Sequence, residues 1–142
     1  MKYVARVAIV VSLVVGLLNV FGLIYLFVEW GPGSAEPRDI VGTWTGPRGA
    51  QVTLREDGTA IATNMPTAYS GYDYRSTISG TGTWSLPRRP DIFVDQAVKI
   101  TIPAGRGERE TELEVDGPGA RHGMHVPVDV ESALGIDFHK AS

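Results

Sequence analysis

The chain has 142 residues, a formal net charge of −3 and no cysteine. The absence of thiols excludes disulfides, thiolate metal sites, a catalytic cysteine and a lipid-modified cysteine as an anchor. No basic cluster of the kind that binds nucleic acid is found, and no motif predicts a cofactor, so neither is an expected partner.

The first predicted element is the apolar run at residues 7–28, which contains no charged residue. As a helix it would extend about 33 Å, enough to cross a hydrocarbon core of about 30 Å. Lipid offers no hydrogen-bond partners to the backbone, so a spanning segment of this kind has to be helical. We therefore predict a transmembrane helix and expect the membrane to be a partner of this segment.

Basic residues flank this run on its N-terminal side only, with Lys2 and Arg6 before it and Glu29 after it. This asymmetry predicts that residues 1–6 are cytoplasmic and that the following domain lies outside the cytoplasmic membrane. The alternative is a cleaved signal peptide, after which the domain would be secreted. Signal peptides usually have apolar regions of about 7–15 residues, so the length of this run favours a retained anchor.

Small residues recur along one face of the predicted helix, at Ala8, Ser12 and Gly16, and Asn19 follows them. This spacing lets two helices approach closely, and an asparagine can add an interhelical hydrogen bond. The pattern predicts a weak homodimer through the helix. The alternative is that such residues are simply common in membrane helices.

Residues 29–39 are rich in Gly and Pro and are predicted to be a linker. Residues 40–142 then form one extracytoplasmic domain of short runs rich in Val, Ile, Thr and Trp. Alternating apolar and polar residues predict about eight antiparallel strands that close as a meander barrel. The expected strands are 40–46, 50–56, 59–64, 78–86, 94–102, 110–116, 123–129 and 135–140.

The clearest predicted hairpin joins residues 52–56 to 59–63 through Asp57 and Gly58. An Asp-Gly pair supplies the positive φ angles of a two-residue type I′ turn, so that turn is expected here.

A Gly-Thr-Trp motif occurs twice, at residues 42–44 and 82–84. The first copy resembles the Gly-x-Trp signature of the calycin superfamily, which includes lipocalins and avidins. The resemblance covers roughly residues 40–140 and is strongest to short bacterial exported proteins of unassigned function. It implies a calycin-like barrel, a small bound ligand, and Lys140 packed across Trp44. Residues 46–49 lack the polar donors of avidins, so biotin binding is not implied.

A long connection, residues 65–77, carries Tyr69, Tyr72 and Tyr74. Loops of this length are often lids or binding loops. Together with Trp44 and Trp84, the tyrosines are the candidate ligand-binding residues. The alternative is that both tryptophans plug the core and the tyrosines cover the end of the barrel.

Other polar residues do not predict catalysis or metal binding. His122 and His125 form an H-x-x-H pattern, but in a strand residues three apart point to opposite faces. His139 is expected to face solvent. Alternating carboxylates at residues 108–116 predict the wet face of a strand, although they would also suit calcium or a cationic partner. No nucleophile motif or apolar carboxylate pair is found, so the protein is not expected to be an enzyme.

These observations favour a membrane-anchored, non-enzymatic binding module for a small apolar or aromatic ligand. The alternative is a domain with a filled core that docks to another cell-envelope protein. An open lumen beneath residues 69–74 is required by the first function and not by the second.

Overall fold

The computed structural model describes residues 2–30, 32–72, 75–89, 94–131 and 134–142. The chain divides into two compact units, Met1–Gly31 and Pro32–Ser142.

The first unit is a single helix, α1 (Lys2–Trp30). Its segment Tyr3–Leu26 is 24 residues long with a mean hydropathy of 2.7, so by length and composition it could cross a membrane. A signal sequence near the N-terminus would meet the same description. The helix extends beyond residues 7–28 because neither Pro nor Gly interrupts its first turns. The Asn19 amide donates to the Val15 carbonyl oxygen at 2.7 Å, so the helix itself satisfies this polar group.

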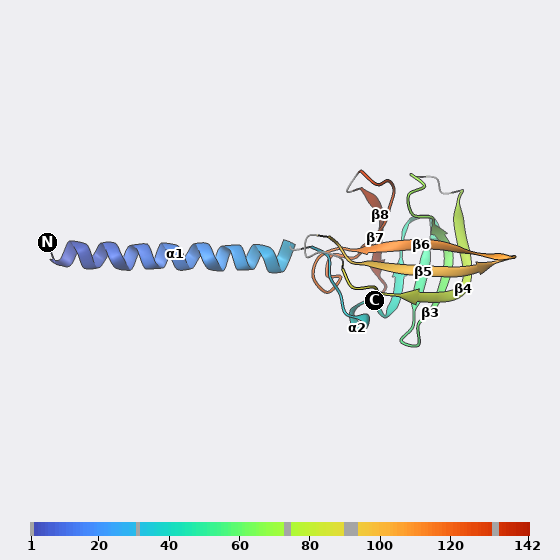
Figure 1. Cartoon of the computed structure of the whole chain (residues 1–142), viewed down its shortest axis with the longest axis horizontal. Coiled ribbons are helices and arrows are strands. Elements are labelled where there is room, and N and C mark those ends of the chain that lie inside the picture. The colour runs from blue at the N-terminus through green and yellow to red at the C-terminus, as the bar shows by residue number, and fades with distance from the viewer. Residues whose placement is uncertain (1, 31, 73–74, 90–93, 132–133) are drawn as a thin grey trace. The chain divides into compact units, whose positions relative to one another are not determined.

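The second unit is a closed antiparallel barrel in which each strand pairs with the next and β8 returns to β1 (Figure 1). This confirms the predicted all-β meander of eight strands. The strands are β1 (Gly42–Thr45), β2 (Gln51–Leu54), β3 (Thr59–Pro66), β4 (Thr77–Ser85), β5 (Ala97–Ala104), β6 (Gly107–Val115), β7 (Met124–Pro127) and β8 (Gly135–Lys140). Two short helices accompany them, α2 (Pro37–Ile40) and the 3₁₀ helix η1 (Pro47–Gly49).

The pairing of the strands is uneven around the barrel. β5 and β6 pair along their whole length, from Ala97↔Glu114 to Ala104↔Gly107, and their hairpin extends past the neighbouring strands (Figure 1). By contrast, the described register of β6 with β7 contains only Glu114↔His125 and Val115↔Met124. At this junction, called here the β6–β7 seam, few backbone pairs join the strands, so side-chain contacts contribute more to holding the barrel closed.

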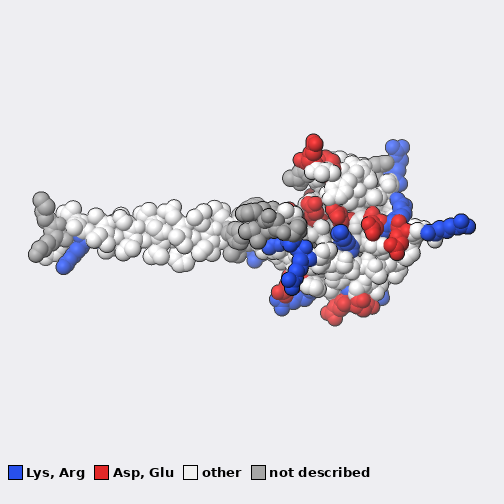
Figure 2. Space-filling model, in the orientation of Figure 1, with Lys and Arg blue, Asp and Glu red and all other residues white. Residues whose placement is uncertain are grey.

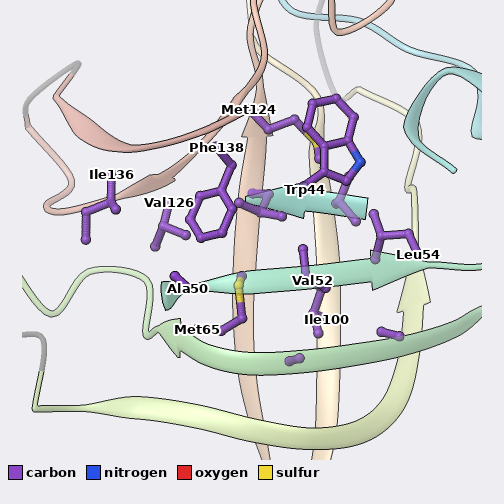
Figure 3. Packing of buried hydrophobic residues seen from close by; sticks show 14 of the residues in the cluster. Trp44, Ala50, Val52, Leu54, Met65, Ile100, Met124, Val126, Ile136 and Phe138 are labelled. Atoms are coloured by element: carbon purple, nitrogen blue, oxygen red, sulfur yellow. The ribbon is translucent and has the colours of Figure 1, made fainter. Parts of the chain in front are cut away.

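The barrel interior is built from the alternating apolar residues of the strands. In Figure 3, Trp44, Met124 and Phe138 from three different strands point into the same space. Side chains that are 3 % exposed or less include Trp44, Val52, Leu54, Met65, Val98, Ile100, Leu113, Val115, Met124, Val126, Ile136 and Phe138. One continuous hydrophobic core therefore fills the space between the strands.

The turn between β2 and β3 differs from the predicted type I′ turn. Gly58 N–H donates to the Arg55 carbonyl oxygen at 3.1 Å, and Arg55 N–H donates to that of Thr59 at 2.9 Å. Gly58, with φ of 83°, is the residue of this turn with a positive φ. Asp57 Oδ1 instead accepts the Thr59 N–H at 2.9 Å, which holds a three-residue loop. The two-residue prediction was wrong because it ignored this side-chain bond.

The segment after α1, which falls within the predicted linker 29–39, is bonded to the barrel from Gly33 onward. Gly33 is buried, and its carbonyl oxygen accepts the Gln96 N–H at 2.9 Å. Ser34 forms an isolated β-bridge with Pro118. Ile40, at the end of α2, is completely buried. These bonds make residues 33–40 part of the barrel domain.

Candidate functional site

The two Gly-Thr-Trp motifs place their tryptophans at one end of the barrel, where β1 begins and β4 ends. The indole of Trp44 is 1 % exposed and donates to the Ile40 carbonyl oxygen at 2.8 Å. The indole of Trp84 is half-buried and donates to the Arg55 carbonyl oxygen at 2.8 Å. Each ring therefore packs at this end while its polar N–H is satisfied by backbone.

The glycine of the second motif has a separate role. A Cβ on Gly82 would lie 2.0 Å from the Thr101 carbonyl oxygen, so only glycine permits β5 to pass this close to β4.

Lys140 packs across Trp44, as the calycin resemblance implies. Its ammonium lies 5.5 Å from the centre of the Trp44 ring, within cation–π range. The same ammonium donates to the Asp39 carbonyl oxygen at 2.8 Å. The last strand is thereby joined to the first strand and to α2.

The tyrosine loop, residues 67–76, lies at the other end of the strands, between β3 and β4. Thr111, a buried residue of β6, holds its start. The Thr111 hydroxyl donates to the Pro66 carbonyl oxygen at 2.8 Å and accepts the Ala68 N–H at 3.0 Å. A single buried threonine therefore satisfies two backbone groups where β3 becomes the loop.

The tyrosine loop also bonds to β7, beyond the short β6–β7 register. Tyr69 N–H donates to the Pro127 carbonyl oxygen at 2.8 Å, and Gly71 N–H donates to that of Val128 at 2.9 Å. The loop thus supplies hydrogen bonds in the region beyond the short β6–β7 register.

Tyr69 has an unusual backbone conformation, with φ of 59°. For a residue other than Gly, Asn or Asp this left-handed conformation costs about 1–2 kcal/mol. The phenol is 49 % exposed and donates a hydrogen bond to Glu112 Oε1 on the outside of β6. This bond, together with partial burial, raises the pKa of Tyr69 to about 12.

A groove of about 460 Å³ lies on the outer face of the barrel beside Tyr69. Its lining includes Tyr69, Ser85, Lys99, Thr101, Glu110 and Glu112. Lys99 faces Glu112 across the β5–β6 register, and Thr101 faces Glu110. Figure 2 shows acidic side chains over the barrel face that carries β6. The groove is therefore polar, with both charge signs and one exposed aromatic ring.

The predicted ligand-binding residues are not gathered around one lumen. Trp44 and Trp84 lie at one end of the strands, while Tyr69 and Tyr72, which is 54 % exposed, belong to the loop at the other end. Tyr74 lies outside the described residues. Of the five candidates, Tyr69 borders the outer groove, and Trp44 and Trp84 pack with the core.

His125 forms a polar cluster at the β6–β7 seam that the sequence pattern did not predict. Its Nδ1 lies 2.8 Å from Asp116 Oδ1, and its Nε2 lies 3.1 Å from Glu114 Oε2. The hydrogen bond to Asp116 is the main reason that the pKa of His125 is raised, although burial acts in the opposite direction. Burial also raises the pKa of Glu114, against the attraction of His125. In the sequence, the only sign of this cluster is that Glu114 and Asp116 lie two residues apart and so share one face of a strand. That His125 lies beside them follows from the β6–β7 register, which the sequence does not show.

His122 and His125 occupy different environments, because His122 lies in a turn and not, as the strand argument assumed, on the same strand as His125. His122 is exposed in the turn before β7, and His125 is a buried residue of β7. His139 is exposed on β8, as expected. Within the described ranges, no group of three or more His, Asp or Glu side chains is placed to hold a metal ion.

Comparison of the chain with models of known protein families, with curated proteins and with solved structures finds no match. The observed architecture, an antiparallel eight-stranded barrel following one long apolar helix, is compatible with a lipocalin-like fold.

Proposed function

We propose that this protein is a non-enzymatic docking domain, anchored by α1 at the outer face of a bacterial cytoplasmic membrane, that binds another cell-envelope protein. The observation that carries the proposal is the filled interior. Trp44, Met65 and Phe138 are at most 1 % exposed and occupy space that a ligand-binding barrel would leave open. Recognition is then a property of the outer surface.

The groove beside Tyr69 is the docking surface in this proposal. Glu110 and Glu112 lie on the outer face of β6, and an exposed phenol borders them. Tyrosine contributes contact area at low entropic cost, and the two carboxylates outnumber the single cation of the groove, Lys99, and so favour a partner of opposite charge. We therefore assign the occupant as an extended, basic segment of the partner protein.

A second candidate function is the binding of a small apolar or aromatic ligand, which the calycin resemblance implies. The groove volume of about 460 Å³ supports it, because small-molecule sites commonly measure about 300–1,000 Å³. The charged lining argues against it, since such sites are mostly apolar. This second proposal includes the proposal that the chain is a member of the calycin superfamily.

Site-specific photo-crosslinking in the producing host tests the docking proposal. A photoreactive phenylalanine analogue replaces Tyr69 in one variant and Thr63, an exposed residue of β3, in the control. We expect one defined protein adduct from position 69, lost when Glu110 and Glu112 are changed to Gln, and none from position 63. Equal labelling at both positions would contradict docking through the groove.

Native mass spectrometry of the full chain, released from detergent, separates the two candidates. A mass excess equal to one small molecule, lost on denaturation and reduced by Tyr69→Ala, would favour the ligand-binding function. A native mass equal to that of the polypeptide alone, together with the protein adduct from position 69, would favour docking.

A further inference from the structure

A second cavity, of about 570 Å³, opens at the barrel end where β1 begins and β8 finishes. It is separate from the groove beside Tyr69, with which it shares no lining residue. Its walls come from four segments: α2, the β6–β7 turn, the end of β8 and Trp44 of β1. The charged and imidazole side chains that line it are Arg38, Asp39, Arg121, His122, His139 and Lys140.

The β6–β7 turn is held in place by its own backbone bonds. His122 N–H donates to the Asp116 carbonyl oxygen at 3.0 Å, and Gly123 N–H donates to that of Ala120 at 3.1 Å. Gly119 N–H donates to the Ser34 carbonyl oxygen, so the segment before α2 braces the same turn. This wall of the cavity is therefore a braced turn that carries Arg121 and His122.

Lys140 is also fixed at the cavity. Its ammonium lies over Trp44, and one of its protons is donated to the Asp39 carbonyl oxygen. An ammonium has three donors, so this geometry leaves donor capacity beyond the Asp39 bond. Arg38, on α2, lies 2.9 Å from the Glu36 carboxylate and is 80 % exposed. The guanidinium is thus reachable from solvent, where exposed ion pairs exchange easily.

The charge of this cavity is opposite to that of its domain. The barrel unit, Pro32–Ser142, contains 11 Lys and Arg against 15 Asp and Glu, a net charge of −4. The cavity lining contains three cationic side chains, two histidines and one carboxylate, Asp39, and a second carboxylate, Glu36, pairs with Arg38 beside it. The Asp39 carboxylate already accepts the Glu36 N–H at 2.8 Å as part of the α2 cap. A concave site with this excess of positive charge focuses a potential that attracts anions.

We propose that this cavity is a binding site for a phosphate group, carried either by a soluble phosphate ester or by a lipid headgroup. Arginine forks match the tetrahedral oxygens of phosphate with paired hydrogen bonds, and lysine adds a point charge. Arg38, Arg121 and Lys140 supply these groups from three directions. The cavity is large enough to receive the phosphate together with the atoms that carry it.

Calorimetric titration of the full chain tests this site, with inorganic phosphate as the probe and the protein in a non-ionic detergent that contains no phosphate. The test variants are Arg121→Gln, which leaves the Lys140–Trp44 contact intact, and the double variant Arg121→Gln/Lys140→Gln. The control is Arg106→Gln at the β5–β6 hairpin tip, which removes the same charge away from the cavity. We expect saturable binding by the wild type and by the control. The Arg121→Gln variant should bind at least about tenfold more weakly.

A repeat with phosphatidylglycerol added to the detergent micelles identifies the source of the phosphate. If the site takes a lipid headgroup, the added lipid weakens the apparent affinity for inorganic phosphate, and the Arg121→Gln variant loses this competition. If it takes a soluble ester, the affinity is the same with and without the lipid. Binding that is absent from the wild type, or equal in the wild type and the Arg121→Gln variant, would overturn the proposal.

Discussion

Replacing His125 by glutamine tests the cluster at the β6–β7 seam. The substitution removes an imidazole that contacts Asp116 at 2.8 Å and Glu114 at 3.1 Å. A hydrogen bond to a charged group contributes about 1.5–3 kcal/mol. The two carboxylates keep 31 % and 29 % of their side-chain exposure, so water compensates part of this loss, and glutamine retains a donor. We expect His125→Gln to lower the free energy of unfolding by about 2 kcal/mol near pH 6.

The effect should depend on pH in a defined direction. The pKa of His125 is raised in the folded barrel, chiefly by the hydrogen bond to Asp116. The protonated ring therefore contributes its full stability below the unfolded pKa of about 6.5, and this contribution is lost as the pH rises through the folded pKa. The raised pKa of Glu114 also makes stability fall with rising pH, but in a window that begins near the ordinary glutamate range. The measurements run from about pH 6, just below the unfolded histidine pKa, to about pH 9.

The assay is thermal unfolding of the full chain in a non-ionic detergent, followed by tryptophan fluorescence at each pH. A loss of about 2 kcal/mol corresponds to a Tm decrease of about 10 °C for a domain of this size. His139→Gln, which alters an exposed imidazole of β8, is the matched control and should change Tm little. A difference in Tm between the wild type and His125→Gln that is the same at about pH 6 and at about pH 9 would contradict the proposed role of the protonated histidine.

Three further predictions concern single side chains. Gly58→Val should destabilise the barrel by about 1–2 kcal/mol in urea unfolding, because φ is 83° there, whereas Gly107→Val, at an open position, should cost much less. Trp44→Ala should cost about 3–5 kcal/mol, because the ring is 1 % exposed and leaves a large cavity; a loss below about 1 kcal/mol would show that the ring is not a core plug. In ultraviolet absorbance titration, the difference between the wild type and Tyr69→Phe should have its midpoint near the raised pKa of about 12; a midpoint near 10 would show that the bond to Glu112 is not formed.

The candidate site shows what local patterns could not supply. Tyr69 was predicted because aromatic residues cluster in a long loop, but its contact with Glu112 joins residues 43 positions apart. The basic cavity needs Arg38, Arg121 and Lys140 to meet, although they are isolated in the sequence. The pairing of His125 with Glu114 depends on the register of β6 and β7, which no local pattern specifies.

The sequence by itself determined the apolar helix, the eight strands and the inward faces of β2, β5, β6 and β8, because hydrophobic periodicity is a local property. It also indicated that Gly58 belongs to a turn, since glycine tolerates a positive φ. Only the tertiary structure decided that the interior is filled and that residues 33–40 join the barrel. These features depend on which distant surfaces meet when the sheet closes, and side-chain volumes and backbone partners are brought together only then.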